Sequence, residues 1–139
     1  MKDPLKILER VKKFEIDEQR RVLMQKLTYE DELQQALKNL IENYENEKEF
    51  MSQNPTLCDF GAYTDQYLKK RRSIEDDIAK VQSEIDKIRD IMSEMFKEQK
   101  TFEIVGQNRN KRKMKELADQ EQKLLDEVGT NTYIKNHQQ

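Results

Sequence analysis

The sequence predicts an all-α protein: two long antiparallel helices that form a coiled-coil hairpin, the second helix longer and extending beyond the first. Charged residues make up 39% of the 139 positions and hydrophobic residues only 35%. A typical globular domain is about a quarter charged and nearly half apolar. Long helices that share a narrow apolar seam leave most of their surface in water and therefore suit this composition. With 3 Gly and 2 Pro, the chain also has too few turn residues for many short strands.

The first helix is expected over residues 5–51, preceded by Pro4, which suits a first helical turn. The seam is imperfect, since Glu18 and Lys26 or Gln25 fall where apolar residues are expected. The predicted seam residues recur at mixed steps of three and four: Ile7, Val11, Phe14, Val22, Tyr29, Leu33, Leu37, Leu40, Tyr44 and Met51.

A turn is expected over residues 52–59. Asn54-Pro55 is a turn signal, since the residue before proline is pushed out of the α region. Asp59 is a good N-cap for the helix that follows. Cys58, beside this turn, has no expected role.

The second helix is expected over residues 60–128, with Gly129 as its C-terminal stop and 129–139 as a flexible tail. Its seam alternates steps of four and three without a slip, which strongly indicates a coiled coil. The seam residues are Tyr67, Arg71, Ile74, Ile78, Val81, Ile85, Ile88, Met92, Met95, Gln99 and Phe102. Residues 1–139 thus form one hairpin, in which folding about Pro55 puts Leu5 opposite roughly residue 105. Residues 108–127 then extend about 30 Å beyond the first helix.

Several classes of function are excluded by composition. A single cysteine permits no intramolecular disulfide, and the lone histidine, His137, offers no triad and no zinc cluster. We therefore expect no enzyme, no catalytic, cofactor-binding or metal-ligating residues, and no cofactor. No window approaches 18 consecutive apolar residues, and no signal-peptide core is found, so a cytoplasmic protein without membrane insertion is expected.

Charge is unevenly distributed although the net charge is only −2. Residues 1–27 have eight basic and five acidic side chains, and residues 28–59 have two and eight. The densest basic run is Arg109, Lys111, Arg112, Lys113 and Lys115. It is either a solvated helix face or a contact for an acidic protein surface. Nucleic acid is disfavoured because no aromatic residues are interleaved and acidic residues follow directly.

Aromatic residues gather around the turn: Tyr44, Phe50, Phe60, Tyr63 and Tyr67. Seam packing accounts for some of them, Tyr44 and Tyr67 first. Phe60 and Tyr63 lie where less of the first helix is available to cover them, so they suit a partner anchor.

The C-terminal part resembles a known family. Glu121, Lys123, Leu125, Asp126 and Glu127 are similar to the E-x-K-x-L-D-E signature that closes the flagellar FliJ proteins. The stretch 37–42 and the Phe60-x-x-Tyr63 entry into the second helix are also similar to that family. The resemblance covers most of the chain in layout.

Resemblance to FliJ implies a non-catalytic part of the flagellar type III protein export apparatus, similar to the central stalk of rotary ATPases. The implied partners are the hexameric export ATPase, the cytoplasmic domain of the export gate and export chaperones, at the inner face of the cell membrane. The basic run with Glu121, Lys123, Leu125, Asp126 and Glu127 would contact the ATPase, and Leu40, Tyr44, Phe60 and Tyr63 the gate.

Two alternatives stay open. One is a stalk protein of a virulence type III secretion system, and the other is a self-associating structural coiled coil. The stalk function predicts a chain that is monomeric alone and gains order when bound.

Overall fold

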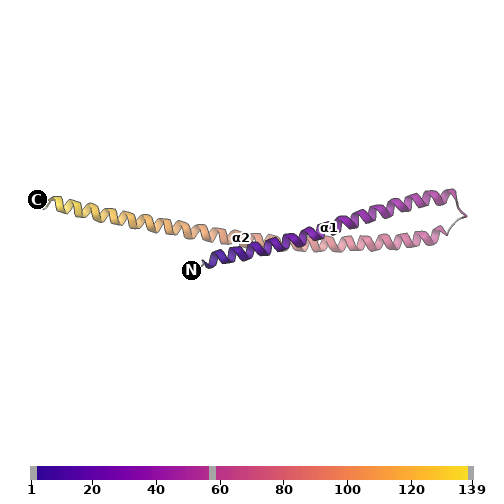
Figure 1. Cartoon of the computed structure of the whole chain (residues 1–139), viewed down its shortest axis with the longest axis horizontal. Coiled ribbons are helices and arrows are strands. Elements are labelled where there is room, and N and C mark those ends of the chain that lie inside the picture. The colour runs from indigo at the N-terminus through magenta and orange to yellow at the C-terminus, as the bar shows by residue number, and fades with distance from the viewer. Residues whose placement is uncertain (1–2, 57–58, 138–139) are drawn as a thin grey trace. The chain divides into compact units, whose positions relative to one another are not determined.

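The structure, a computed structural model, describes residues 3–56 and 59–137 and consists there of two long helices without strands. Helix α1 spans Pro4–Gln53 and α2 spans Phe60–His137 (Figure 1). The predicted all-α class with a longer second helix is confirmed. Neither helix contains, in its described residues, an apolar stretch long enough to cross a membrane.

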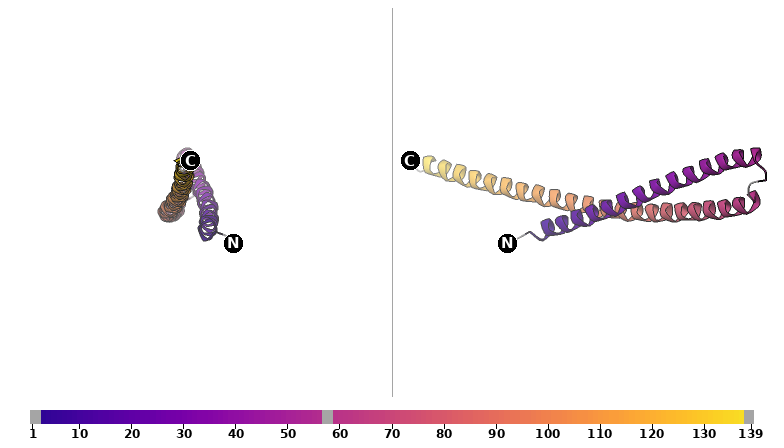
Figure 2. Two further views of the ribbon diagram at one scale, coloured as in Figure 1. Left: turned by 90° about the vertical axis from the view of Figure 1, so that its left-hand side faces the viewer. Right: turned by 45° about the vertical axis from the view of Figure 1, so that its right-hand side comes forward.

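The chain divides into two compact units. The turn unit is Lys13–Phe96, and the terminal unit is Met1–Lys12 with Lys97–Gln139. Within the turn unit, α1 and α2 lie side by side and run antiparallel from the turn (Figures 1 and 2).

Polar contacts between the helices of the turn unit show that α1 and α2 are antiparallel, because residue numbers fall along α1 as they rise along α2. The Tyr44 and Thr64 hydroxyls lie 3.1 Å apart, and the Gln82 amide donates to Glu30 at 3.2 Å. Lys26 pairs with Glu84 at 2.9 Å.

The terminal unit shows the same antiparallel pairing over its own short length. Lys12 forms an ion pair with Glu98, and Leu5 Cδ2 approaches within 3.4 Å of where a Cβ on Gly106 would stand. The predicted position of Leu5, opposite about residue 105, is thus confirmed.

Local side-chain bonds set the helix ends. The Leu5 N–H donates to the Asp3 carboxylate at 3.0 Å at the start of α1, where Pro4 takes the first position. Asn54 closes α1 by donating from its side chain to the Phe50 carbonyl at 3.1 Å.

Helix α2 begins with the expected cap on Asp59, whose carboxylate accepts from the Ala62 N–H at 3.2 Å. Residues 57 and 58 of the expected turn, Cys58 included, lie outside the described residues.

The C-terminal end of α2 differs from the predicted end at 128. The helix runs through Gly129, which has no positive φ, to His137. Thr132 Oγ1 donates to the Val128 carbonyl at 2.8 Å, and the Tyr133 and His137 rings stack at 3.9 Å. Glycine inside a helix costs about 1 kcal/mol relative to alanine, but the helix continues past it. Residues 129–137 of the predicted tail are therefore helical, and 138–139 lie outside the described part.

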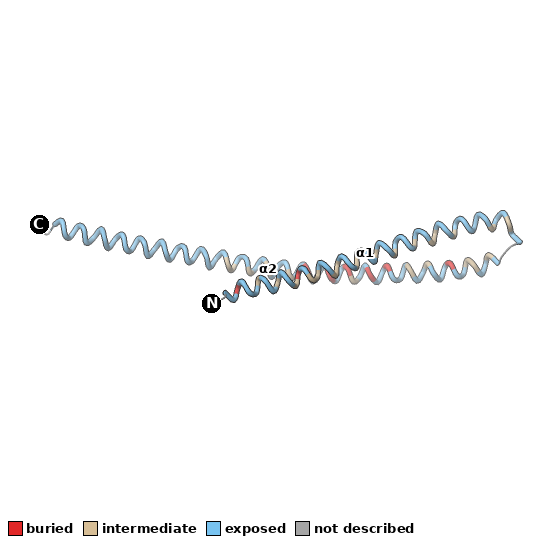
Figure 3. The backbone as a smooth tube through the Cα atoms, viewed as in Figure 1, coloured by how far each residue is buried: buried red, intermediate tan, exposed pale blue. Residues whose placement is uncertain are grey.

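The seam of α2 is confirmed at every predicted position, since each is buried or half-buried. Burial is deepest at Val81, which is 1% exposed, and Ile85, which is 3% exposed. Figure 3 shows the buried segments of the tube in red. The half-buried members are Arg71, Ile74, Met95, Gln99 and Phe102.

The predicted seam of α1 is wrong in its first part. Ile7, Val11, Phe14 and Tyr29 are exposed, while Leu5 and Ile16 are buried. All six remaining predicted seam residues are half-buried: Val22, Leu33, Leu37, Leu40, Tyr44 and Met51.

The side-chain stems of two lysines explain which face of α1 packs against α2. Lys12 and Lys26 occupy seam positions with their side chains only 15% and 38% exposed, and their ammonium groups reach Glu98 and Glu84 on α2. Long lysine side chains can cover apolar surface while the charge stays at the edge. The stems of the two lysines therefore fill seam positions of α1 that apolar side chains would otherwise take.

Two substitutions in α1 distinguish the observed seam from the predicted one. We expect Ile16→Ala, at a side chain only 2% exposed, to lower the free energy of unfolding by about 2 kcal/mol. Phe14→Ala, at a side chain 66% exposed, should change it by less than about 0.5 kcal/mol. Urea unfolding followed by circular dichroism measures both. Equal losses of stability would contradict the burial of Ile16 and the exposure of Phe14.

The Lys26–Glu84 pair makes stability depend on pH. The hydrogen bond from Lys26 lowers the pKa of Glu84 below its ordinary value of 4.5. A carboxyl whose pKa is lower in the folded state stabilises the fold above its unfolded pKa and loses that contribution as pH falls. Between about pH 6 and pH 3, the wild type should therefore lose more stability than Glu84→Gln, measured by urea midpoints. Parallel pH profiles of the two proteins would refute this.

Candidate partner-binding surfaces

Three of the residues expected at the gate contact form one aromatic cluster beside the turn. The Tyr44 ring stacks between rings of α2, with centroids 5.9 Å from Phe60, 6.1 Å from Tyr63 and 3.8 Å from Tyr67. Phe60 and Tyr63 are half-buried, so part of each side chain stays open to solvent. Leu40, the fourth expected residue, is half-buried on α1. We name Tyr44, Phe60, Tyr63 and Tyr67 the tip cluster.

Tyr67 belongs to both the seam and the tip cluster. Its ring is 6% exposed and lies nearly parallel to Tyr44, at an interplanar angle of 4°. Sequence reasoning placed Tyr67 in the seam but not in the contact set. Its four-residue spacing from Tyr63, one helical turn, was the signal that could have placed it beside the gate candidates.

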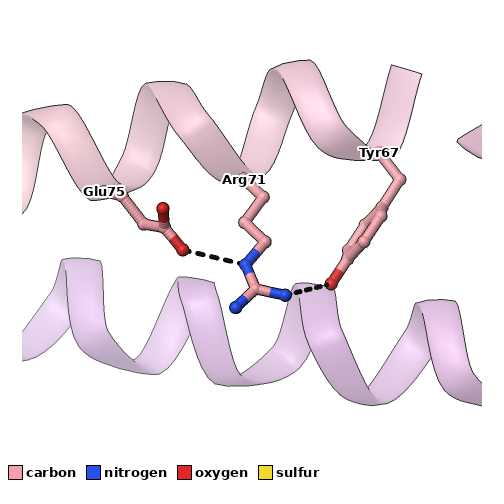
Figure 4. A network of polar contacts seen from close by, with 3 residues as sticks. All are labelled: Tyr67, Arg71 and Glu75. Carbon is pink, nitrogen blue, oxygen red and sulfur yellow. Dashed lines mark hydrogen bonds and ion pairs between the residues drawn. The ribbon is translucent and has the colours of Figure 1, made fainter. Parts of the chain in front are cut away.

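A charged network holds Tyr67 in place (Figure 4). Arg71 donates from Nη1 to the Tyr67 hydroxyl at 3.1 Å and from Nε to the Glu75 carboxylate at 2.8 Å. The hydrogen bonds to Glu75 and Tyr67 raise the pKa of Arg71. Arg71 thus occupies a seam position without an unpaired charge.

The phenol of Tyr63 stays protonated. Burial first, and then the charge of Glu47, raise the pKa of Tyr63 above 10.0. At neutral pH this hydroxyl is therefore a neutral hydrogen-bond group beside the exposed ring edge of the tip cluster.

A hollow of 280 Å³ opens next to Phe60. Its walls combine apolar side chains with one ammonium group, and they are formed by Lys48, Met51, Ser52, Pro55 and Phe60. An apolar or aromatic side chain of a partner, with an acidic neighbour, suits such a hollow.

The second surface is the exposed end of α2, residues 107–137, which we name the arm. Every described residue in this range is exposed, whereas Gly106 is half-buried against α1. Figure 3 shows this part of α2 in pale blue throughout. Residues 108–127, which were predicted to extend beyond the first helix, are therefore uncovered by α1 as expected.

The ATPase-contact candidates all lie on the exposed surface at the arm. Arg109 Nη1 lies 3.9 Å from Asp3 Oδ1. The Asp126 carboxylate accepts a hydrogen bond from the Gln122 amide at 3.1 Å. The others are exposed on the arm: Lys111, Arg112, Lys113, Lys115, Glu121, Lys123, Leu125 and Glu127.

Apolar residues of the arm were missing from the predicted contact set apart from Leu125. Met114 is 68% exposed, Leu117 54%, Leu124 61% and Val128 54%. With Leu125 they recur at helical spacing and form one apolar face. The signal was present, because these residues continue the three- and four-residue steps of α2. We name these five residues the arm face.

The comparisons with known proteins point to one family. The family model of the flagellar FliJ protein matches residues 1–138 of the chain. No match to a curated protein or to a solved structure was found.

The tip cluster predicts a graded loss of stability at Tyr44. Tyr44→Phe removes the hydroxyl contact with Thr64 and should cost about 1 kcal/mol or less. Tyr44→Ala also removes the ring from the centre of the stack and should cost about 2 kcal/mol or more. Urea unfolding measures both. Equal losses would show that the hydroxyl, and not the ring, holds the cluster together.

Proposed function

Because the chain belongs to the flagellar FliJ family and is thus associated with flagellar protein export, we propose that it is the stalk of the export apparatus. In this proposal the arm binds the hexameric export ATPase, and the tip cluster binds the cytoplasmic domain of the export gate or export chaperones. The chain itself has no catalytic role, in keeping with a non-enzymatic family.

The observation that carries the proposal is the arm face. A run of large apolar side chains, each more than half exposed, lies on the arm, which no other helix of the described residues covers. Such a face marks a protein interaction site. The surrounding basic run, from Arg109 to Lys115, adds attraction for an acidic rim on the partner.

The tip cluster supports a separate second contact. Its aromatic edges and the hollow beside Phe60 give an anchor of the kind that dominates binding energy at interfaces. Nearby, residues 28–59 are strongly acidic, whereas the basic run lies on the arm. Two surfaces of opposite charge suit two different partners.

The proposal is tested by the response of the export ATPase to the purified chain. We expect the wild type to raise ATPase hexamer formation or turnover. Leu117→Gln should reduce this effect about tenfold, because it places a polar amide in the bound face. Leu68→Gln is the matched control, since Leu68 is 53% exposed and lies outside the arm, and it should leave the response unchanged.

An ATPase that does not respond to the wild-type chain would refute the stalk function. Phe60→Ala tests the second contact and should weaken binding to the gate domain while leaving the ATPase response intact. Sedimentation tests the structural alternative, which requires dimers or larger species at micromolar concentration, where the stalk function expects a monomer.

A further inference from the structure

One carboxylate lies within the arm face. Glu121 is seven residues after Met114 and seven before Val128, and residues seven apart on a helix drift by only about 20°. The other acidic residues of the arm do not share this line. Glu121 is therefore the one acidic side chain, among the described residues of the arm, that a partner covering the face would have to bury.

Nothing on the arm itself neutralises Glu121. Helical neighbours lie three and four residues away in either direction, and here they are all apolar: Leu117, Ala118, Leu124 and Leu125. Within the described part of the chain, no hydrogen bond or ion pair joins Glu121 to another residue. The nearby Asp126, by contrast, accepts a hydrogen bond from Gln122.

Burial of this carboxylate without a partner would be strongly unfavourable. Covering the arm face with a purely apolar surface would remove water from the Glu121 carboxylate and leave its charge without hydrogen bonds or a counter-charge. A surface that binds the face must therefore supply a cation or several hydrogen-bond donors at this point.

A second copy of the chain does not meet this requirement. In parallel pairing in register, Glu121 of each copy would meet the same residue of the other. Antiparallel pairing centred on the face has the same result. Like charges that meet at a seam destabilise the pair, so Glu121 opposes self-association through this face.

We propose that Glu121 is the specificity-determining residue of the arm, and that the surface receiving the arm is an apolar groove with an arginine or lysine opposite Glu121. This inference rests on the proposed function in one respect, that the groove belongs to the export ATPase. It goes further by stating which chemistry the groove contains and which residue of this chain selects it.

The test compares three variants of the full-length chain for affinity to the hexameric export ATPase. Glu121→Gln and Glu121→Leu should each weaken binding about tenfold, because both leave the partner's cation buried without its counter-charge. Glu116→Gln, an exposed acid off the face, is the matched control and should stay within about twofold. Glutamine and leucine are good helix formers, and circular dichroism checks that helicity is kept.

Glu121→Leu decides between the proposal and a face that works by apolar contact alone. Binding as tight as, or tighter than, the wild type would overturn the proposal while leaving the stalk function standing. A wild-type chain that does not bind the ATPase would instead refute the stalk function itself.

Self-association provides a readout that does not need the ATPase. Sedimentation of Glu121→Leu at micromolar concentration should reveal dimers, because the apolar face is then uninterrupted, whereas the wild type and Glu116→Gln should stay monomeric. A Glu121→Leu chain that remains monomeric would overturn the role of Glu121 in excluding a second copy.

Discussion

The structure depends on the burial of one narrow strip of α2 against α1. Between Tyr67 and Met92, β-branched and other apolar side chains of α2 face α1 and are nearly removed from water. The opposite side of the seam is mixed, since α1 contributes Ile16 together with the stem of Lys26. Hydrophobic contact along this strip holds two helices that are otherwise almost wholly solvated. Register, the position of the turn and the placement of both surfaces follow from it.

The α2 half of the seam was predictable because its pattern is unambiguous. Ile78, Val81, Ile85 and Ile88 alternate steps of three and four with no competing stripe, so only one face of the helix can be buried. The turn was equally clear from Asn54-Pro55 and the cap residue Asp59, because each acts through local backbone geometry.

The α1 half was not predictable from polarity alone. Its first turns carry apolar residues on two sides, and Ile7 and Val11 form the more regular series although Leu5 and Ile16 are the buried ones. The choice depends on Lys12 and its ion pair with Glu98, a contact across the seam that a pattern of hydrophobicity cannot represent. The candidate surfaces divide in a similar way. The tip aromatics and the charged arm residues were found from the sequence, whereas Tyr67 and most of the arm face were left out of the predicted contact sets although their helical spacing carried the signal.

The continuation of α2 through Gly129 gives the arm a gradient of local stability. Backbone hydrogen bonds in the arm are made within one helix, and all of its described residues, 107–137, are exposed. Opening a helical segment that lacks buried side chains requires less free energy than opening the hairpin seam. Glycine inside a helix costs about 1 kcal/mol relative to alanine, so the arm is easiest to open around Gly129. A surface that lies against the arm would therefore stabilise its helix as well as bind its side chains.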